Sequence, residues 1–410
     1  MVRFRFRRET KERMSALRTL LRAPHVRRLL TASQVGRLPM ASAPLALLLF
    51  ARESHSLALA GLVVGAYTAG MAVSAPILAR IVDRWRQPPV LWGSALLSGA
   101  GFLLVAAGGH ATGATMAGAL LGGLGTPPLE ACLRALWPDL VEADVVAAAY
   151  TLDIAVQEVI YVTGPLVTLL AVAVAGPPAG LVAAALLQLA GVALFASTPV
   201  VRTWRGVAAV RHWAGPLRVG RFVLILLGVV GAGAAIGSLP VAVTGYAEAA
   251  GNRSLSGWLL AAEAAGALTG GLLYMRARPG GRSRLPLVTA GLAAGFLPLL
   301  LMPGPAAMAV LLAVAGLSLP PVLTAVFLTA DRLTPAGTAV EAFAWVITAF
   351  TVGSAAGAAI TGPLVGDSVR YGFTFAPIAG LLAVAAMSAV AYGPGGRRSA
   401  DHPSPSGRGG

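Results

Sequence analysis

The chain of 410 residues has few charged side chains and very few of the residues that catalyse reactions or bind metals. Only 11% of its residues are charged, whereas a soluble domain carries roughly a quarter. There is one cysteine, Cys132, so neither a disulfide within the chain nor a thiolate cluster can form. The single lysine, Lys11, lies near the N-terminus, and a phosphate-binding loop needs a lysine after its glycines. ATP hydrolysis is therefore excluded as a source of energy.

The histidines do not indicate a catalytic or metal site inside the membrane either, because all of them lie in predicted loops, tails or ends of apolar segments. They are His25, His55, His110, His212 and His402. An intramembrane base or metal ligand of the usual kind is therefore missing, and the sequence contains no His-Glu-x-x-His motif. We predict that the protein is not an enzyme and has neither a metal site nor a cofactor.

Apolar residues dominate the chain, at 57%, and the mean hydropathy is +0.77. A helix that crosses a bilayer needs about 20 mostly apolar residues, and the strands of a porin-type barrel would instead alternate in hydrophobicity. We predict an all-α polytopic membrane protein with twelve spans. They are placed at 29–51, 57–79, 89–109, 112–133, 147–173, 178–198, 219–246, 255–275, 285–303, 305–329, 339–365 and 371–393.

The net charge of +15 comes from arginines that gather on one side of these spans. They lie in the N-terminal segment, after even-numbered spans and in the centre of the chain, whereas Arg52, Arg253 and Arg370 occupy the opposite loops. Such asymmetry orients helical membrane proteins with the basic side in the cytoplasm. We predict a multi-pass protein of the plasma or inner membrane with both termini cytoplasmic, and no binding to nucleic acid.

The two ends of the chain are predicted to be cytoplasmic tails. Residues 1–28 are basic over too great a length for a signal peptide, and no small-residue cleavage site follows the first apolar run. Residues 394–410 are rich in Gly, Pro, Ser and Arg and are predicted to be disordered.

The sequence repeats itself at a spacing of about 196 residues. Ser42-Ala43-Pro44-Leu45 returns as Ser238-Leu239-Pro240-Val241, and Pro127-Pro128 returns as Pro320-Pro321. Thr163-Gly164-Pro165-Leu166-Val167 returns as Thr361-Gly362-Pro363-Leu364-Val365. We predict two pseudo-symmetric six-helix halves, 29–198 and 219–393, joined by a cytoplasmic loop at 199–218. Two homologous halves can enclose a central site that opens alternately to either side.

The segment after the second span reads Ala-Arg-Ile-Val-Asp-Arg-Trp-Arg-Gln-Pro from Ala79 to Pro88. With the 6+6 pattern, it resembles the major facilitator superfamily (MFS), which carries the motif Gly-x-x-x-Asp-Arg-x-Gly-Arg-Arg after its second span. Within the superfamily, the chain is similar to the efflux permeases. Asp83 and Arg84 match this motif, whereas both glycines are replaced. Gly164-Pro165 match the start of the fifth-span motif of exporters, but Thr168 and Leu169 stand where its glycines would be. The arginine that drug–proton antiporters carry in their fourth span is absent.

The resemblance implies roles for two groups of residues. Asp83, with Arg84, would act as a gate by accepting hydrogen bonds from the start of the eleventh span, where the helix dipole favours an anion. The alternative is a solvated turn with one surface ion pair, which contributes about 0–1 kcal/mol. Gly164, Pro165, Gly362 and Pro363 are predicted to be structural, at equivalent depths of the two halves.

Polar residues inside the spans are costly and usually face a cavity or a partner. The candidates for a substrate or proton pathway are Gln34, Arg37, Tyr67, Asp153, Gln157, Glu158, Tyr161 and Glu263. We predict that Arg37 pairs with Asp153 or Glu158, either as part of the pathway or as a structural pair. Glu130 and Arg134, four residues apart, are interpreted as a local pair at the membrane interface.

Glu263 has no cation within two turns of its own helix, and burial favours the protonated form of a carboxylate. It is our candidate proton carrier, with a static hydrogen-bonded role as the alternative. Five Gly-x-x-x-Gly motifs, among them Gly61/Gly65 and Gly353/Gly357, are interpreted as packing sites within a monomer.

The predicted function is secondary transport of small organic solutes across the bilayer, by proton-coupled export with alternating access. Two alternatives remain open. One is an uncoupled facilitator or importer of a metabolite, and the other is a membrane scaffold or receptor that does not transport.

Overall fold

The computed structural model describes residues 19–108, 111–206, 213–252, 254–275 and 284–392. The first 18 residues of the predicted basic tail and the whole of the predicted tail 394–410 lie outside these ranges. So do residues 207–212 of the predicted central loop.

All secondary structure in the described part of the chain is helical. The first half contains α2 (Val26–Arg37), α3 (Pro39–Arg52), α4 (Leu57–Arg84), α5 (Gln87–Ala107), α6 (Thr112–Leu124), α7 (Leu129–Leu140), α8 (Val146–Ala175) and α9 (Pro177–Ala196). The connecting segment contains α10 (Pro199–Thr203) and the 3-10 turn η1 (Gly215–Arg218). The second half contains α11 (Gly220–Ala249), α12 (Leu255–Tyr274), α13 (Arg284–Phe296), η2 (Leu297–Leu301), α14 (Pro305–Gly316), α15 (Leu319–Leu333), α16 (Ala339–Asp367) and α17 (Val369–Tyr392).

Each of the twelve predicted spans coincides with one helix or with two consecutive ones, which confirms the fold class. Among the described residues, ten helical segments are long and apolar enough to cross a membrane. The predicted span 112–133 is not among them because it is divided into α6 and α7, and α12 is less apolar, since it carries Glu263.

The prolines explain where the predicted spans are interrupted. Proline has no backbone N–H and clashes with the preceding turn of a helix. Pro127-Pro128 separate α6 from α7, and their repeat, Pro320-Pro321, lies in the first turn of α15, just after the break that follows α14. The first span is likewise divided, between α2 and α3, where Pro39 begins the second helix. The repeated proline pairs thus place equivalent breaks in the two halves.

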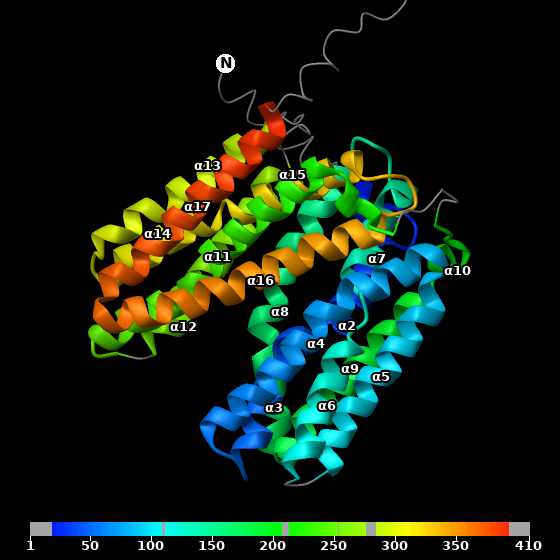
Figure 1. Cartoon of the computed structure of the whole chain (residues 1–410), viewed down its shortest axis with the longest axis horizontal. Coiled ribbons are helices and arrows are strands. Elements are labelled where there is room, and N and C mark those ends of the chain that lie inside the picture. Colours follow the sequence, from blue (N-terminus) through cyan, green and yellow to red (C-terminus); the bar gives the residue numbers. More distant parts are fainter. Residues whose placement is uncertain (1–18, 109–110, 207–212, 253, 276–283, 393–410) are drawn as a thin grey trace, which may run out of the picture.

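The helices form two bundles, α2–α9 and α11–α17 (Figure 1). The bundles meet near α7, α15 and the start of α16, and they diverge toward α3 and α6 on one side and α12 and α14 on the other (Figure 1). Two pairs of long helices connect them, α4 with α16 and α8 with α12. We call the end where the bundles meet the closed end, and the other the open end.

Small residues allow the closest helix contacts inside the second bundle. A Cβ atom on Gly233 or Gly237 of α11 would lie within 2.3 Å of the α16 backbone, and Gly357 of α16 is equally close to α11. Helices can approach this closely only where the side chain is a hydrogen atom. The interpretation of these motifs as packing sites within the chain therefore holds here. It does not hold for Gly61 and Gly65 of α4, beside which a Cβ would meet no atom within 4 Å.

Candidate functional site

A cavity of about 820 Å³ lies between the two bundles. Ligand pockets of this kind are typically about 300–1,000 Å³, so it can hold a molecule of drug size. Its walls come from α3, α4, α7 and α8 on one side and from α11, α12, α15 and α16 on the other. Most of the lining is apolar, and includes Met40, Met71, Ile236, Leu260, Leu323 and Phe350.

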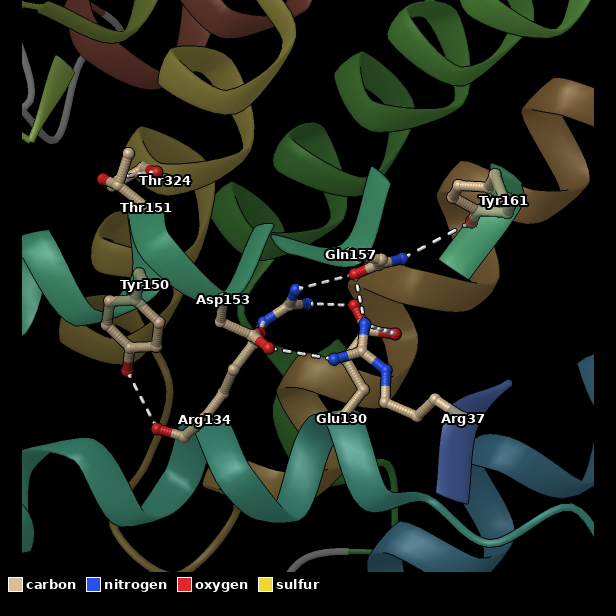
Figure 2. Close-up of polar contacts among 9 residues, drawn as sticks. All are labelled: Arg37, Glu130, Arg134, Tyr150, Thr151, Asp153, Gln157, Tyr161 and Thr324. Carbon is tan, nitrogen blue, oxygen red and sulfur yellow. Dashed lines mark hydrogen bonds and ion pairs between the residues drawn. The ribbon is translucent and has the colours of Figure 1, made fainter. Parts of the chain in front are cut away.

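Four buried charges form a network at the edge of this cavity (Figure 2). Arg37 of α2 pairs with Asp153 of α8 at 2.9 Å and with Glu130 of α7 at 3.2 Å. Arg134 of α7 pairs with the same two carboxylates, at 2.9 Å and 2.5 Å. Arg37 and Arg134 are only 2% and 1% exposed. Two arginines and two carboxylates cancel, so the network carries no net charge.

Gln157 extends the network toward the cavity. Its Oε1 accepts hydrogen bonds from both guanidinium groups, and its Nε2 donates to the hydroxyl of Tyr161 at 3.4 Å (Figure 2). Asp153, Gln157 and Tyr161 follow one another at four-residue intervals along one face of α8. Tyr161 is 47% exposed and lies in the cavity wall.

The network corrects one prediction and supports another. The predicted pair between Arg37 and Asp153 is present. The interpretation of Glu130 and Arg134 as a local interfacial pair is wrong: they do pair with each other, but both are buried and both contact residues of other helices. The cause is the break at Pro127-Pro128, after which α7 begins with Glu130 in its first turn.

Two carboxylates of the cavity wall lie outside this network. Glu158 of α8 and Glu263 of α12 face the same cavity, one from each bundle, and are close enough to interact electrostatically. Among the described residues, neither has an ion pair or a hydrogen bond to its side chain. Arginines of the network are not available to them, because each already contacts both Glu130 and Asp153.

The closed end is held by contacts between α4 and α16. Asp83, at the end of α4, accepts hydrogen bonds from the backbone N–H groups of Val340 at 3.3 Å and Glu341 at 2.8 Å. Both residues lie in the first turn of α16, where unsatisfied N–H groups favour an anion. Glu341 in turn pairs with Arg80 of α4 at 2.5 Å. The geometry matches what the resemblance implied for Asp83, whereas Arg84 is exposed beside it.

The remaining predicted residues differ in whether they line the cavity and whether they pack against other helices. Tyr67 is buried and lines the cavity, but Gln34 does not line it, and its amide has no hydrogen-bond partner among the described residues. Gly164 packs against Ala41 and Ser42 of α3, whereas its repeat, Gly362, has open space beside it. Pro165 lies in the cavity wall, and Pro363 is exposed on α16.

Sequence reasoning missed the residues that join the two bundles. Glu341 was not singled out, and no partner was predicted for Arg80. Thr151 of α8 and Thr324 of α15 share a hydrogen bond of 3.0 Å across the bundles, and the Arg134 guanidinium lies 4.0 Å from the ring centre of Phe327. A glutamate in the first turn of a predicted span, as at Glu341, was the available signal.

A helical membrane bundle of two halves, with a central cavity closed at one end, defines a solute carrier. A family model described as "Major Facilitator Superfamily" matches residues 37–358. The chain belongs to this superfamily. It is a multi-pass membrane protein and a secondary transporter of small solutes, not an enzyme. Among the described residues, no group of three or more His, Cys, Asp or Glu is placed to hold a metal ion.

Solved structures share the fold at low sequence identity. An outward-facing bacterial homologue of the iron transporter ferroportin is 16% identical, with a TM-score of 0.71 over 89% of this chain and 98% of that one. The human organic anion transporter MFSD10 (TETRAN) is 16% identical, with a TM-score of 0.62 over 88% and 99%. The E. coli fucose:proton symporter FucP is 12% identical, with a TM-score of 0.67 over 88% and 97%. A comparison with curated protein sequences gives no match.

Proposed function

We propose that the protein exports small organic solutes in exchange for protons, by alternating access of the central cavity. The observation that supports this is the pair Glu158 and Glu263, which face one cavity from the two bundles with no cation among the described lining residues left to neutralise them. An ionised carboxylate in an apolar site is costly unless it is paired or protonated. Each can therefore be neutral with a proton in one half of the cycle and release it in the other.

The surroundings of the two glutamates favour them over the other acids as proton carriers. The other titratable or charged residues of the cavity wall are Tyr67, Glu130, Arg134 and Tyr161. Glu130 is held by Arg37 and Arg134, as is Asp153 behind it, so both carboxylates already have countercharges. The two tyrosines are neutral at physiological pH.

Alternating access requires that the closed end can open. The contacts that Asp83 and Glu341 make between α4 and α16 are polar, and these groups can exchange them for water when the bundles part. We propose that this end faces the cytoplasm, as the arginine distribution predicts. The structure is then the outward-open state of a monomeric carrier of the plasma or inner membrane.

Uptake into proteoliposomes with and without an imposed pH gradient tests the proposal. Ethidium, fluorescein and glucose serve as cationic, anionic and neutral solutes. We expect the gradient to drive at least one of them uphill, Glu263→Gln to abolish this accumulation while sparing exchange at equal concentrations, and Glu263→Asp to retain part of it. Glu142→Gln, which changes an exposed loop carboxylate, is the matched control. Accumulation by Glu263→Gln at the rate of the unchanged protein would contradict proton carriage by Glu263.

A further inference from the structure

The chemistry of the cavity wall also restricts the kind of solute that the protein carries. We propose that the substrate is a hydrophobic organic cation, held between Glu158 and Glu263 in place of the protons. This inference rests on the proposed transport function and adds the substrate class to it. It follows from the charges, from the walls and from the size of the cavity.

The charges of the cavity wall are unbalanced. Glu130 and Arg134 also reach the cavity, but the network that contains them is neutral as a whole. When ionised, Glu158 and Glu263 therefore add two negative charges, and no cation among the described lining residues balances them. A bound anion would be a third negative charge in a site of low polarity, which is strongly unfavourable. A cation would instead supply the missing countercharge.

The walls favour an organic ion over a metal ion. A divalent metal needs several oxygen or nitrogen ligands, and the described residues offer no cluster of three such acidic, histidine or cysteine side chains. Most of the cavity lining is apolar or aromatic, with Phe350 and the half-exposed ring of Tyr161 in the same wall as the two glutamates. Apolar surface and aromatic faces bind large, weakly hydrated cations.

The position of the two glutamates links the cation to the proton. One glutamate lies on each bundle, so a cation between them contacts both halves of the carrier. Protonation of the pair removes the negative charge that attracts the cation, and binding of the cation expels protons to the solvent. Cation and protons thus compete for the same carboxylates, which is the requirement for exchange of one against the other.

An experiment with two ions of one shape tests the inference. Tetraphenylphosphonium and tetraphenylborate are nearly identical in size and opposite in charge. Binding of tritiated tetraphenylphosphonium to the purified, bead-immobilised protein is measured by scintillation proximity, with unlabelled ions as competitors. We expect saturable binding that weakens as the pH falls from about 8 to about 5, displacement by unlabelled tetraphenylphosphonium, and no displacement by tetraphenylborate. Equal displacement by tetraphenylborate would overturn the inference, as would binding that is independent of pH.

Variants assign the binding to the two glutamates. We expect Glu158→Gln and Glu263→Gln each to weaken binding by about tenfold, and the double variant to weaken it further. Glu142→Gln should bind as the unchanged protein does. Wild-type affinity in the double variant would overturn the inference, and thermal unfolding of the same samples verifies that each variant is folded. The binding assay is done without a pH gradient, so it tests the substrate class separately from proton coupling. If the protein binds the cation but shows no pH-driven flux in proteoliposomes, only the proton coupling is rejected. Accumulation of fluorescein or glucose without binding of the cation would reject only the substrate class.

Discussion

Arg37 shows how one buried charge constrains the residues around it. Its side chain is 2% exposed and contacts Glu130 and Asp153, which both also contact Arg134. Removal of one member leaves an uncompensated charge, whereas removal of an oppositely charged pair leaves the remaining pair neutral. The network is thus stable only as a balanced set.

Substitution of Arg37 tests this balance. We expect Arg37→Met to lower the free energy of unfolding by about 3–5 kcal/mol, because it leaves one excess negative charge in the bundle. Arg37→Met combined with Asp153→Asn should recover about 1–3 kcal/mol, since Glu130 and Arg134 then remain as a neutral pair. Thermal unfolding in detergent measures both effects. Arg52→Met, at an exposed end of α3, is the control, and strictly additive losses would speak against the network.

At the scale of residues, the sequence predicted the contact of a charge that had no partner on its own helix. It missed the further contacts of charges that could already pair within one helix. Arg37 had no partner on its own helix, so a carboxylate of the fifth span had to be sought. Glu130 and Arg134 already satisfied each other at a spacing of four residues, and nothing in the sequence required more. The positions of Glu158 and Glu263 in one cavity followed only from the packing of α8 against α12.

Helices α4 and α16 contact each other at the closed end but are apart at the open end. At the closed end they are joined by Asp83, Arg80 and Glu341. At the open end α4 exposes Gly61 and Gly65, and α16 exposes Gly362 and Gly366, with no atom within 4 Å of an added Cβ. Helical periodicity places these glycines on the faces that carry cavity residues Thr68 and Ala358. We infer that the two glycine stripes approach each other when the open end closes.

Larger side chains at these glycines should therefore block the cycle without weakening the fold. We expect Gly65→Leu and Gly362→Leu to leave the thermal midpoint within a few degrees of the unchanged protein. Uphill transport should fall by about tenfold or more, because the open end cannot close. Proteoliposome flux measures this, with Gly93→Leu on α5 as the control, since that glycine is also exposed with open space beside it. Normal flux in both variants would exclude closure at these stripes.

At the scale of helices, the repeat predicted equivalent positions in the two halves but not the breaks within them. Pro127-Pro128 and Pro320-Pro321 were recognised as counterparts, yet the spans containing them were expected to be continuous. A proline can kink a helix or end it, and Pro240 lies inside the continuous helix α11. Which outcome occurs depends on whether neighbouring helices satisfy the freed carbonyl groups.

The orientation of the whole molecule in the membrane can be tested with single cysteines. In a Cys132→Ala background, Arg205→Cys precedes Gly206, which packs against Asp83 at the closed end, and Arg370→Cys lies in the first turn of α17, just after the C-terminal end of α16. We expect a maleimide that does not cross membranes to label Arg370→Cys in intact cells and to label Arg205→Cys only after the cells are opened, because the arginine-rich side is cytoplasmic. Labelling of Arg205→Cys from outside would reverse the orientation.

The two unpaired glutamates also determine how the carrier would respond to membrane voltage. If one monovalent cation leaves while two protons enter on Glu158 and Glu263, each cycle moves one net positive charge inward. A potential of 100 mV, negative inside, then contributes about 2.3 kcal/mol to export in addition to the pH difference. Currents on solid-supported membranes should therefore accompany transport by the unchanged protein. The variant Glu158→Gln, which retains Glu263, should exchange one proton for one cation and produce no net current.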